Sequence, residues 1–146
     1  MDFYNKIFEM DKKLSSEQKM NIHFNSLKNF ILHYNEAKKE KSHITILIQN
    51  YIEYLESKDY NLTNEESLKA YYFYINELGK IYSKHSKFSL KFNKLVFVVF
   101  TILPNAIIWF VFRSIAVSII ILIPYIYLFA KLYQKYKKGK IYGLKW

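Results

Sequence analysis

The chain has 146 residues, of which 51% are hydrophobic and 19% aromatic, and its formal net charge at pH 7 is +10. It has no cysteine and only three glycines, which excludes disulfide frameworks, thiolate metal sites and the glycine-rich loops that bind phosphates or dinucleotides. All twelve acidic residues lie at or before Glu77, whereas Arg113 and eleven lysines follow it. The two halves of the chain therefore face different surroundings.

Apolar residues recur at helical spacing through residues 1–90. A first stripe runs from Phe3 to Leu14, and a second runs from Met20 to Tyr34, with Ser16 as its expected N-cap. A third stripe starts near Ser42. Its run ITILI is rich enough in β-branched residues to suit a strand, but the 3.6-residue period continues into YIEYLES and favours a helix.

The fourth helix is expected to start at a capping box formed by Thr63 and Glu66. Its apolar face is predicted to hold Leu68, Tyr71, Ile75, Leu78 and Tyr82, and the helix is predicted to run on through Phe88 and Phe92. Four amphipathic helices predict a small antiparallel bundle over residues 1–90. Because no signal peptide precedes it, this domain is expected in the cytoplasm.

Residues 95–130 form an apolar block in which Arg113 is the only charge. Helices over 95–112 and 115–133 would each be about 27–28 Å long, close to the ~30 Å thickness of the hydrocarbon core of a bilayer. The sequence therefore predicts an all-α protein in which the bundle is followed by a two-helix transmembrane hairpin over 95–133. The polar pair Arg113-Ser114 marks its apex, because an arginine is costly among acyl chains. A soluble helical fold with the block as its core is the alternative.

Lysines on both sides of the block indicate its orientation. Both termini are expected in the cytoplasm, with the hairpin in the inner membrane of a bacterium and residues 134–146 as a basic cytoplasmic tail. Because the positive charge brackets the block, anionic lipid headgroups are the expected partners and nucleic acid is not. The predicted headgroup contacts are Lys91, Lys94, Lys131, Lys135, Lys137 and Lys138.

A hairpin folded at 113–114 brings two prolines to the same depth. The resulting polar spot would consist of Thr101, Pro104, Asn105, Pro124 and Tyr125. One interpretation is that a packed hairpin tolerates these residues. The other is that the spot faces its copies in a homo-oligomer and lines a path through the membrane.

The sequence offers no pattern typical of catalysis. Its four histidines never occur at the i, i+4 spacing of a helical metal pair, and its carboxylates are scattered among lysines. A non-enzymatic protein without metal or cofactor is expected. In the run YYFY, Tyr71, Tyr72 and Tyr74 are the candidates for binding a protein partner, since tyrosine offers large, rigid contact area.

The stretch from Ile44 to Ile81 resembles the last two helices of the enterocin A/pediocin-type bacteriocin immunity proteins. It shares a helix that ends in Leu55–Lys58, the segment LTNEE, and a final helix with INELGKI. This resemblance implies a protein that protects a bacteriocin producer by engaging a toxin-occupied membrane receptor. The apolar block departs from that family, whose members are soluble. The alternative function is a holin-like or phage-defence effector that oligomerises through the hairpin and permeabilises the inner membrane.

Overall fold

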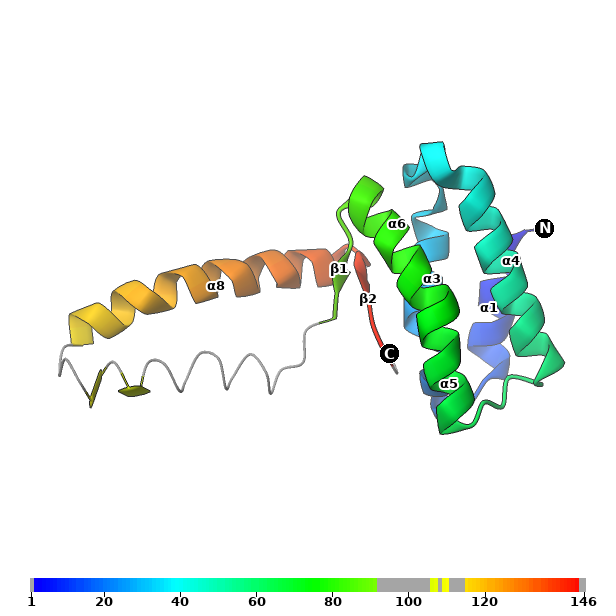
Figure 1. Cartoon of the computed structure of the whole chain (residues 1–146), viewed down its shortest axis with the longest axis horizontal. Helices are drawn as coiled ribbons and strands as arrows, with labels where there is room; N and C mark the ends of the chain where they lie inside the picture. The colour runs from blue at the N-terminus through cyan, green and yellow to red at the C-terminus, as the bar shows by residue number, and fades with distance from the viewer. Residues whose placement is uncertain (1, 92–105, 108, 111–114, 145–146) are drawn as a thin grey trace. The chain divides into compact units, whose positions relative to one another are not determined.

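The computed structural model describes residues 2–91, 106–107, 109–110 and 115–144, and its chain divides into two compact units (Figure 1). The first unit combines Met1–Lys91 with Gly139–Trp146, and the second is Phe92–Lys138. The described residues are mostly helical, which confirms the all-α prediction, and the first unit is a helical bundle.

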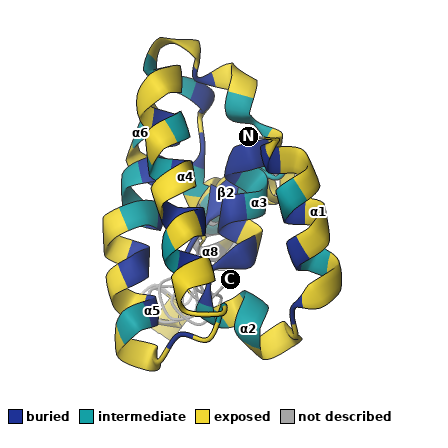
Figure 2. Ribbon diagram, turned by 90° about the vertical axis from the view of Figure 1, so that its right-hand side faces the viewer, coloured by how far each residue is buried: buried dark blue, intermediate teal, exposed yellow. Residues whose placement is uncertain are grey.

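The bundle contains helices, short 3-10 turns and two very short strands. Its buried faces point inward and its polar faces outward, and β2 lies beside α3 (Figure 2). The elements are α1 (Phe3–Lys13), α2 (Ser16–Asn21), α3 (Phe24–Leu32), η1 (Tyr34–Glu36), η2 (Lys38–Glu40), α4 (Lys41–Ser57), α5 (Asn64–Ala70), η3 (Tyr71–Ile75), α6 (Asn76–Ser86), β1 (Ser89–Leu90) and β2 (Ile141–Tyr142).

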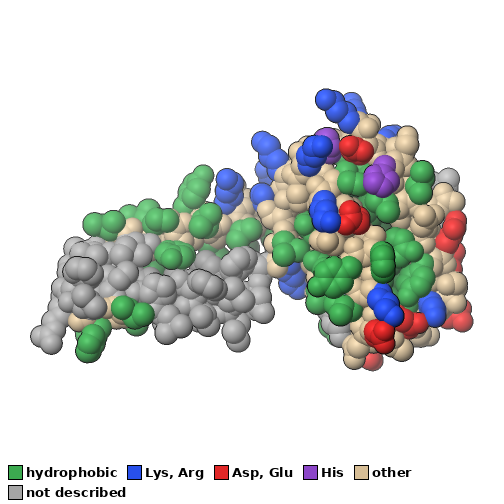
Figure 3. Space-filling model, viewed as in Figure 1, with side chains coloured by type: hydrophobic (Ala, Val, Ile, Leu, Met, Phe, Trp, Pro, Cys, Tyr) green, Lys and Arg blue, Asp and Glu red, His purple; other side chains and the backbone are tan. Residues whose placement is uncertain are grey.

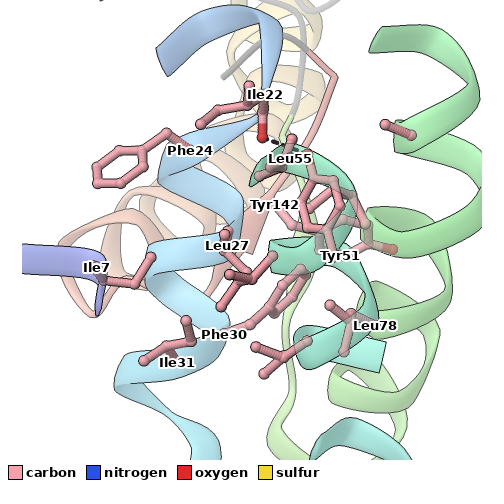
Figure 4. Close-up of a cluster of buried hydrophobic side chains, with 14 of the residues drawn as sticks. Ile7, Ile22, Phe24, Leu27, Phe30, Ile31, Tyr51, Leu55, Leu78 and Tyr142 are labelled. Carbon is pink, nitrogen blue, oxygen red and sulfur yellow. Dashed lines mark hydrogen bonds between the residues drawn. The ribbon is translucent and has the colours of Figure 1, made fainter. Parts of the chain in front are cut away.

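The first and third helices agree with the sequence prediction. The whole stripe from Phe3 to Leu14 is buried, and ITILI is helical within α4, where Ile44 and Ile48 are fully buried. In the core, aromatic side chains satisfy polar backbone atoms. The hydroxyl of Tyr51 donates to the carbonyl oxygen of Ile22 at 2.6 Å (Figure 4).

The second predicted helix is wrong in detail, because it is two helices. His23 has a left-handed conformation (φ 51°) that separates α2 from α3, and Met20 is 45% exposed. The N-cap is Ser15, which forms a capping box with Gln18. Because Tyr51 binds the carbonyl of Ile22, the interrupted backbone keeps a hydrogen-bond partner at the break.

The segments α5, η3 and α6 form one continuous helix with a π-helical turn at its centre. The capping box of Thr63 and Glu66 is confirmed. In the π turn the amide of Asn76 donates to the carbonyl of Tyr71, five residues back, so the turn holds one extra residue. As a consequence, Ser67 is buried in the turn before the π turn. Leu68, which was predicted on the buried face, is 44% exposed.

The predicted continuation of this helix through Phe88 is also wrong. The helix ends at Ser86 because Lys87 is left-handed (φ 59°), and Phe88 turns back into the core, where it is 4% exposed. Phe92 lies outside the described residues. The chain leaves the bundle through β1 instead.

Strand β1 pairs in parallel with β2, with Ser89 opposite Ile141 and Leu90 opposite Tyr142. The bundle unit therefore includes Gly139–Trp146, which was predicted to be part of a separate tail. Residues 139–144 are not separate from the bundle, since Ile141 and Tyr142 are 5% and 7% exposed. The chain departs from this unit after Lys91 and re-enters it at Gly139.

In the second unit, α8 (Ile115–Lys137) contains Pro124. No helix in the described ranges combines the length and the apolar character that a membrane crossing requires. The apex residues Arg113 and Ser114 lie outside those ranges, so the hairpin over 95–133 stays a prediction.

Candidate functional site

The three predicted partner-binding tyrosines have different surroundings. Tyr71 is 8% exposed, its ring lies edge-on to that of buried His23 at 5.5 Å, and burial raises its pKa. Tyr74 is half-buried and stacks on Tyr51 at 4.9 Å. Tyr72 is 58% exposed. Of the three, only Tyr72 offers its ring to a partner.

The most exposed aromatic side chain among the bundle's described residues was not among the predicted binding residues. Phe73, in the same π turn, is 69% exposed. Leu68, Tyr72 and Phe73 lie within six residues of one helix and together form what we call the aromatic ridge. A strict 3.6-residue period does not place Leu68 in the ridge, because the extra residue of the π turn moves Leu68 from the buried face to the exposed one. Solvent-exposed rings of this kind are typical of protein-binding surfaces.

A second feature is the slot that holds the C-terminal segment. The ring of Tyr142 lies directly against Gly79, where a Cβ atom would be 2.7 Å from Cδ2 of the tyrosine and would overlap other ring atoms. On its other side the ring approaches Phe30 at 5.7 Å, and Phe30 in turn stacks on Tyr82 at 4.9 Å. Because Gly79 has no side chain, it leaves room for the ring of Tyr142, and the Cβ atom of any other residue would occupy that space.

Polar contacts fix the same segment to α3. Ser26, which is fully buried, donates to the carbonyl of Gly143 at 3.1 Å and accepts from its amide at 2.9 Å. Asn29 donates to the carbonyl of Ile141 at 2.8 Å, and Lys140 pairs with Glu36 at 2.6 Å. Residues 140–143 are thus held by side chains from α3 and η1, and Tyr142 lies against Gly79 of α6. Nothing in the charge pattern of the tail indicated this.

Among the side chains of α8 that the structure describes, nine large hydrophobic ones are more than half exposed (Figure 3). Ile126, Tyr127, Leu128 and Phe129 are consecutive, so they cover the whole circumference of the helix. The others are Ile119, Ile120, Ile123, Tyr133 and Tyr136.

The predicted membrane residues are only partly described. Pro124 is exposed and Tyr125 is half-buried on α8, while Thr101, Pro104 and Asn105 lie outside the described residues. The polar spot therefore stays a prediction. Among the predicted headgroup contacts, Lys91 belongs to the bundle, Lys94 is outside the described residues, and the rest lie near the end of α8: Lys131, Lys135, Lys137 and Lys138.

Two shallow grooves flank Tyr60 in the loop between α4 and α5. One, of about 290 Å³, lies between α1 and α4, and the other, of about 400 Å³, lies beside α2. Asp59 and Tyr60 both have left-handed backbones. The first groove mixes lysines with carboxylates, including Lys6 paired with Glu56, so its charges are internally balanced.

Titratable groups in the bundle serve its structure. Lys58 and the amide of Thr63 both donate to Glu66 and lower its pKa to about 2. Lys19 and Lys28 donate to Asp11 and lower its pKa. Burial raises the pKa of Tyr51 and of Tyr82. No group of three or more histidine or acidic side chains in the described residues is arranged to hold a metal ion.

The geometry thus offers an aromatic ridge for binding and an exposed apolar helix. Comparisons with models of protein families, with curated proteins and with solved structures gave no match.

Proposed function

We propose that this chain is a non-enzymatic, membrane-tethered binding protein of the bacteriocin-immunity kind. In this proposal the bundle binds a protein partner at the bacterial inner membrane, and Phe92–Lys138 holds the bundle there. The observation that carries it is the exposed apolar surface of α8.

The exposed apolar side chains of α8 are unfavourable in contact with water on all sides of the helix. Transfer of one side chain of this size out of water contributes about 1.5–3 kcal/mol, and nine such side chains of α8 are more than half exposed. Contiguous apolar surface of this extent is typical of membrane or protein contact. Lys131 and Lys137 lie near the rings of Tyr127 and Tyr133, at 6.0 and 5.1 Å from their centroids, a combination typical of the membrane interface.

The path of the chain favours a hairpin rather than a single crossing of the membrane. Met1–Lys91 and Gly139–Trp146 belong to one folded unit, so both must lie in one compartment. Any passage of Phe92–Lys138 through a bilayer then has an even number of crossings. The even number of crossings does not depend on the lysine counts.

The aromatic ridge is the proposed partner surface. Its two aromatic side chains are exposed on a helix that is otherwise fixed by buried Tyr71 and Ile75, so their positions are set before a partner arrives. The resemblance of residues 44–81 to immunity proteins covers this ridge. Tethering adds to binding because it raises the effective concentration of the bundle near a membrane target.

The test is protection of a sensitive bacterial strain. The full chain is expressed in that strain, and growth is measured against a panel of class II bacteriocins. We expect resistance to at least one of them. Unchanged killing across the panel would contradict the immunity-like function, and loss of membrane potential on expression alone would favour the permeabilising alternative.

A pair of variants locates the partner surface. Phe73→Ser removes the most exposed ring of the ridge and is expected to abolish protection at unchanged protein level. Phe8→Ser is the matched control, because Phe8 is a 60% exposed phenylalanine on α1, outside the ridge. Equal loss of protection in both variants would exclude the ridge as the specific surface.

A further inference from the structure

One end of the bundle gathers lysines that are far apart in the sequence. It is formed by η2, the start of α4, and the end of α6 with β1. Nε2 of His85 lies 3.8 Å from Oε1 of Glu40, which joins α6 to η2, and His33 packs edge-on against Phe88 at 5.4 Å. We call this the basic end, and its lysines are Lys38, Lys39, Lys41, Lys84, Lys87 and Lys91.

Positive charge dominates the basic end. Of its two carboxylates, Glu36 is paired with Lys140 at 2.6 Å and with His33 at 2.8 Å, whereas Glu40 lies 3.8 Å from His85, beyond hydrogen-bond distance. Lys38, Lys39, Lys84 and Lys87 are exposed, and no acidic side chain in the described residues pairs with them. In Figure 3 lysine side chains gather at the upper end of the bundle, whereas most acidic side chains lie along its right-hand and lower margins.

We propose that the basic end is a docking surface for an anionic lipid bilayer, which fixes how the bundle faces the membrane. This rests on the proposed membrane tether. Lys87 precedes Leu95, the first residue of the apolar block, by eight residues, so the chain between them spans at most about 27 Å. Headgroups at the tether are therefore within reach of the basic end.

The surface suits lipid better than nucleic acid. Leu32 and Leu90, each 53% exposed, lie at the ends of α3 and β1 beside these lysines. Exposed aliphatic side chains next to lysines match the boundary between headgroups and acyl chains. Sites for single-stranded nucleic acid instead combine basic grooves with exposed stacking rings.

The experiment uses the full chain reconstituted into vesicles. The absence of native cysteine permits one fluorophore at Ser42→Cys, in the basic end, or at Ser16→Cys, at the start of α2, as a distant reference. Quenching by nitroxide-headgroup lipid is measured in phosphatidylcholine vesicles with and without phosphatidylglycerol. Flotation of the neutral vesicles reports insertion separately.

We expect phosphatidylglycerol to increase quenching at Ser42→Cys but not at Ser16→Cys, and high salt to reverse the increase. Each lysine near an anionic surface contributes about fivefold to binding, so Lys84→Gln with Lys87→Gln should lower the docked-to-free ratio about 25-fold. Lys12→Gln with Lys13→Gln, at the end of α1, makes the same charge change elsewhere and should leave the ratio unchanged.

Three outcomes would overturn the proposal. The first is that protein that floats with the vesicles shows the same quenching with and without phosphatidylglycerol. The second is an equal loss in the control variant. The third is tighter binding of a DNA or RNA oligonucleotide than of anionic vesicles through the same lysines. Failure to float with neutral vesicles would instead refute the membrane tether of the proposed function.

Discussion

Replacing Gly79 with alanine tests whether residues 139–144 are a structural part of the bundle. Where nothing covers a helical glycine, alanine stabilises the helix by about 0.5–1 kcal/mol, because glycine loses more backbone entropy on folding. Here the added Cβ would overlap the ring of Tyr142. Overpacking of a filled core costs about 1–3 kcal/mol, and Tyr142 is only 7% exposed, so its ring has little room to move.

The sign of the effect should therefore depend on Tyr142. In the native background, Gly79→Ala should destabilise the bundle by up to about 2.5 kcal/mol, the overpacking cost less the helix gain. In a Tyr142→Ala background it should stabilise by about 0.5–1 kcal/mol, because the ring is gone. Tyr142→Ala alone should cost about 3–5 kcal/mol, as other large aromatic truncations do.

The assay is urea unfolding of the full chain in a mild detergent, followed by hydrogen exchange at the amides of α6, which reports the bundle separately from α8. A double-mutant cycle then gives the coupling between Gly79 and Tyr142, expected at about 1–3 kcal/mol. The same change in stability in both backgrounds, with zero coupling, would refute the docked position of the C-terminal segment.

Three further changes test other parts of the bundle. Deletion of Phe73 removes the extra residue of the π turn and leaves seven residues from buried Ser67 to buried Ile75, about two α-helical turns, so thermal unfolding should change little while protection against bacteriocin is lost. Glu66→Gln should lower stability at pH 7, and the difference from the native chain in urea titrations should disappear as the pH falls from 4.5 to about 2, because a carboxylate with a lowered pKa stabilises only while ionised. Tyr51→Phe leaves the buried carbonyl of Ile22 without its donor and should cost about 1–3 kcal/mol in the same titrations; no measurable change would mean that another donor replaces the hydroxyl.

Local signals in the sequence predicted much of the bundle. The capping box of Thr63 and Glu66 depends on two residues three positions apart, and the stripe from Phe3 to Leu14 depends on one regular helix. Both kinds of pattern lie within a single element. They were correct because no distant residue alters them.

The errors occurred where distant residues decide the structure. No glycine or proline marks the break at His23, which depends on the contact of Tyr51 with Ile22. The π turn shifts the periodicity that placed Leu68 in the core. The same shift explains why part of the candidate site was missed, since Leu68 lies on the exposed face beside Tyr72 and Phe73 instead of in the core.

The C-terminal segment is the clearest case. The tetrapeptide GKIY occurs at Gly79–Tyr82 and at Gly139–Tyr142, and sequence alone offers no reason to connect the two copies. In the fold they meet: Gly79 of the first receives Tyr142 of the second, and both tyrosines pack against Phe30. Lysine, isoleucine and tyrosine are frequent in this chain, so the repeated tetrapeptide did not indicate a contact. Only the tertiary structure defines it.

The pairing of β1 with β2 also imposes an order on synthesis. The apolar segment is synthesised before Tyr142, so the bundle lacks the residues that fill its slot until all of Phe92–Lys138 has been made. Until then Phe30 and Gly79 have no aromatic partner from the C-terminal segment. The bundle can thus be completed only after the apolar segment has been translated, and a nascent chain arrested before residue 142 would expose that slot to chaperones.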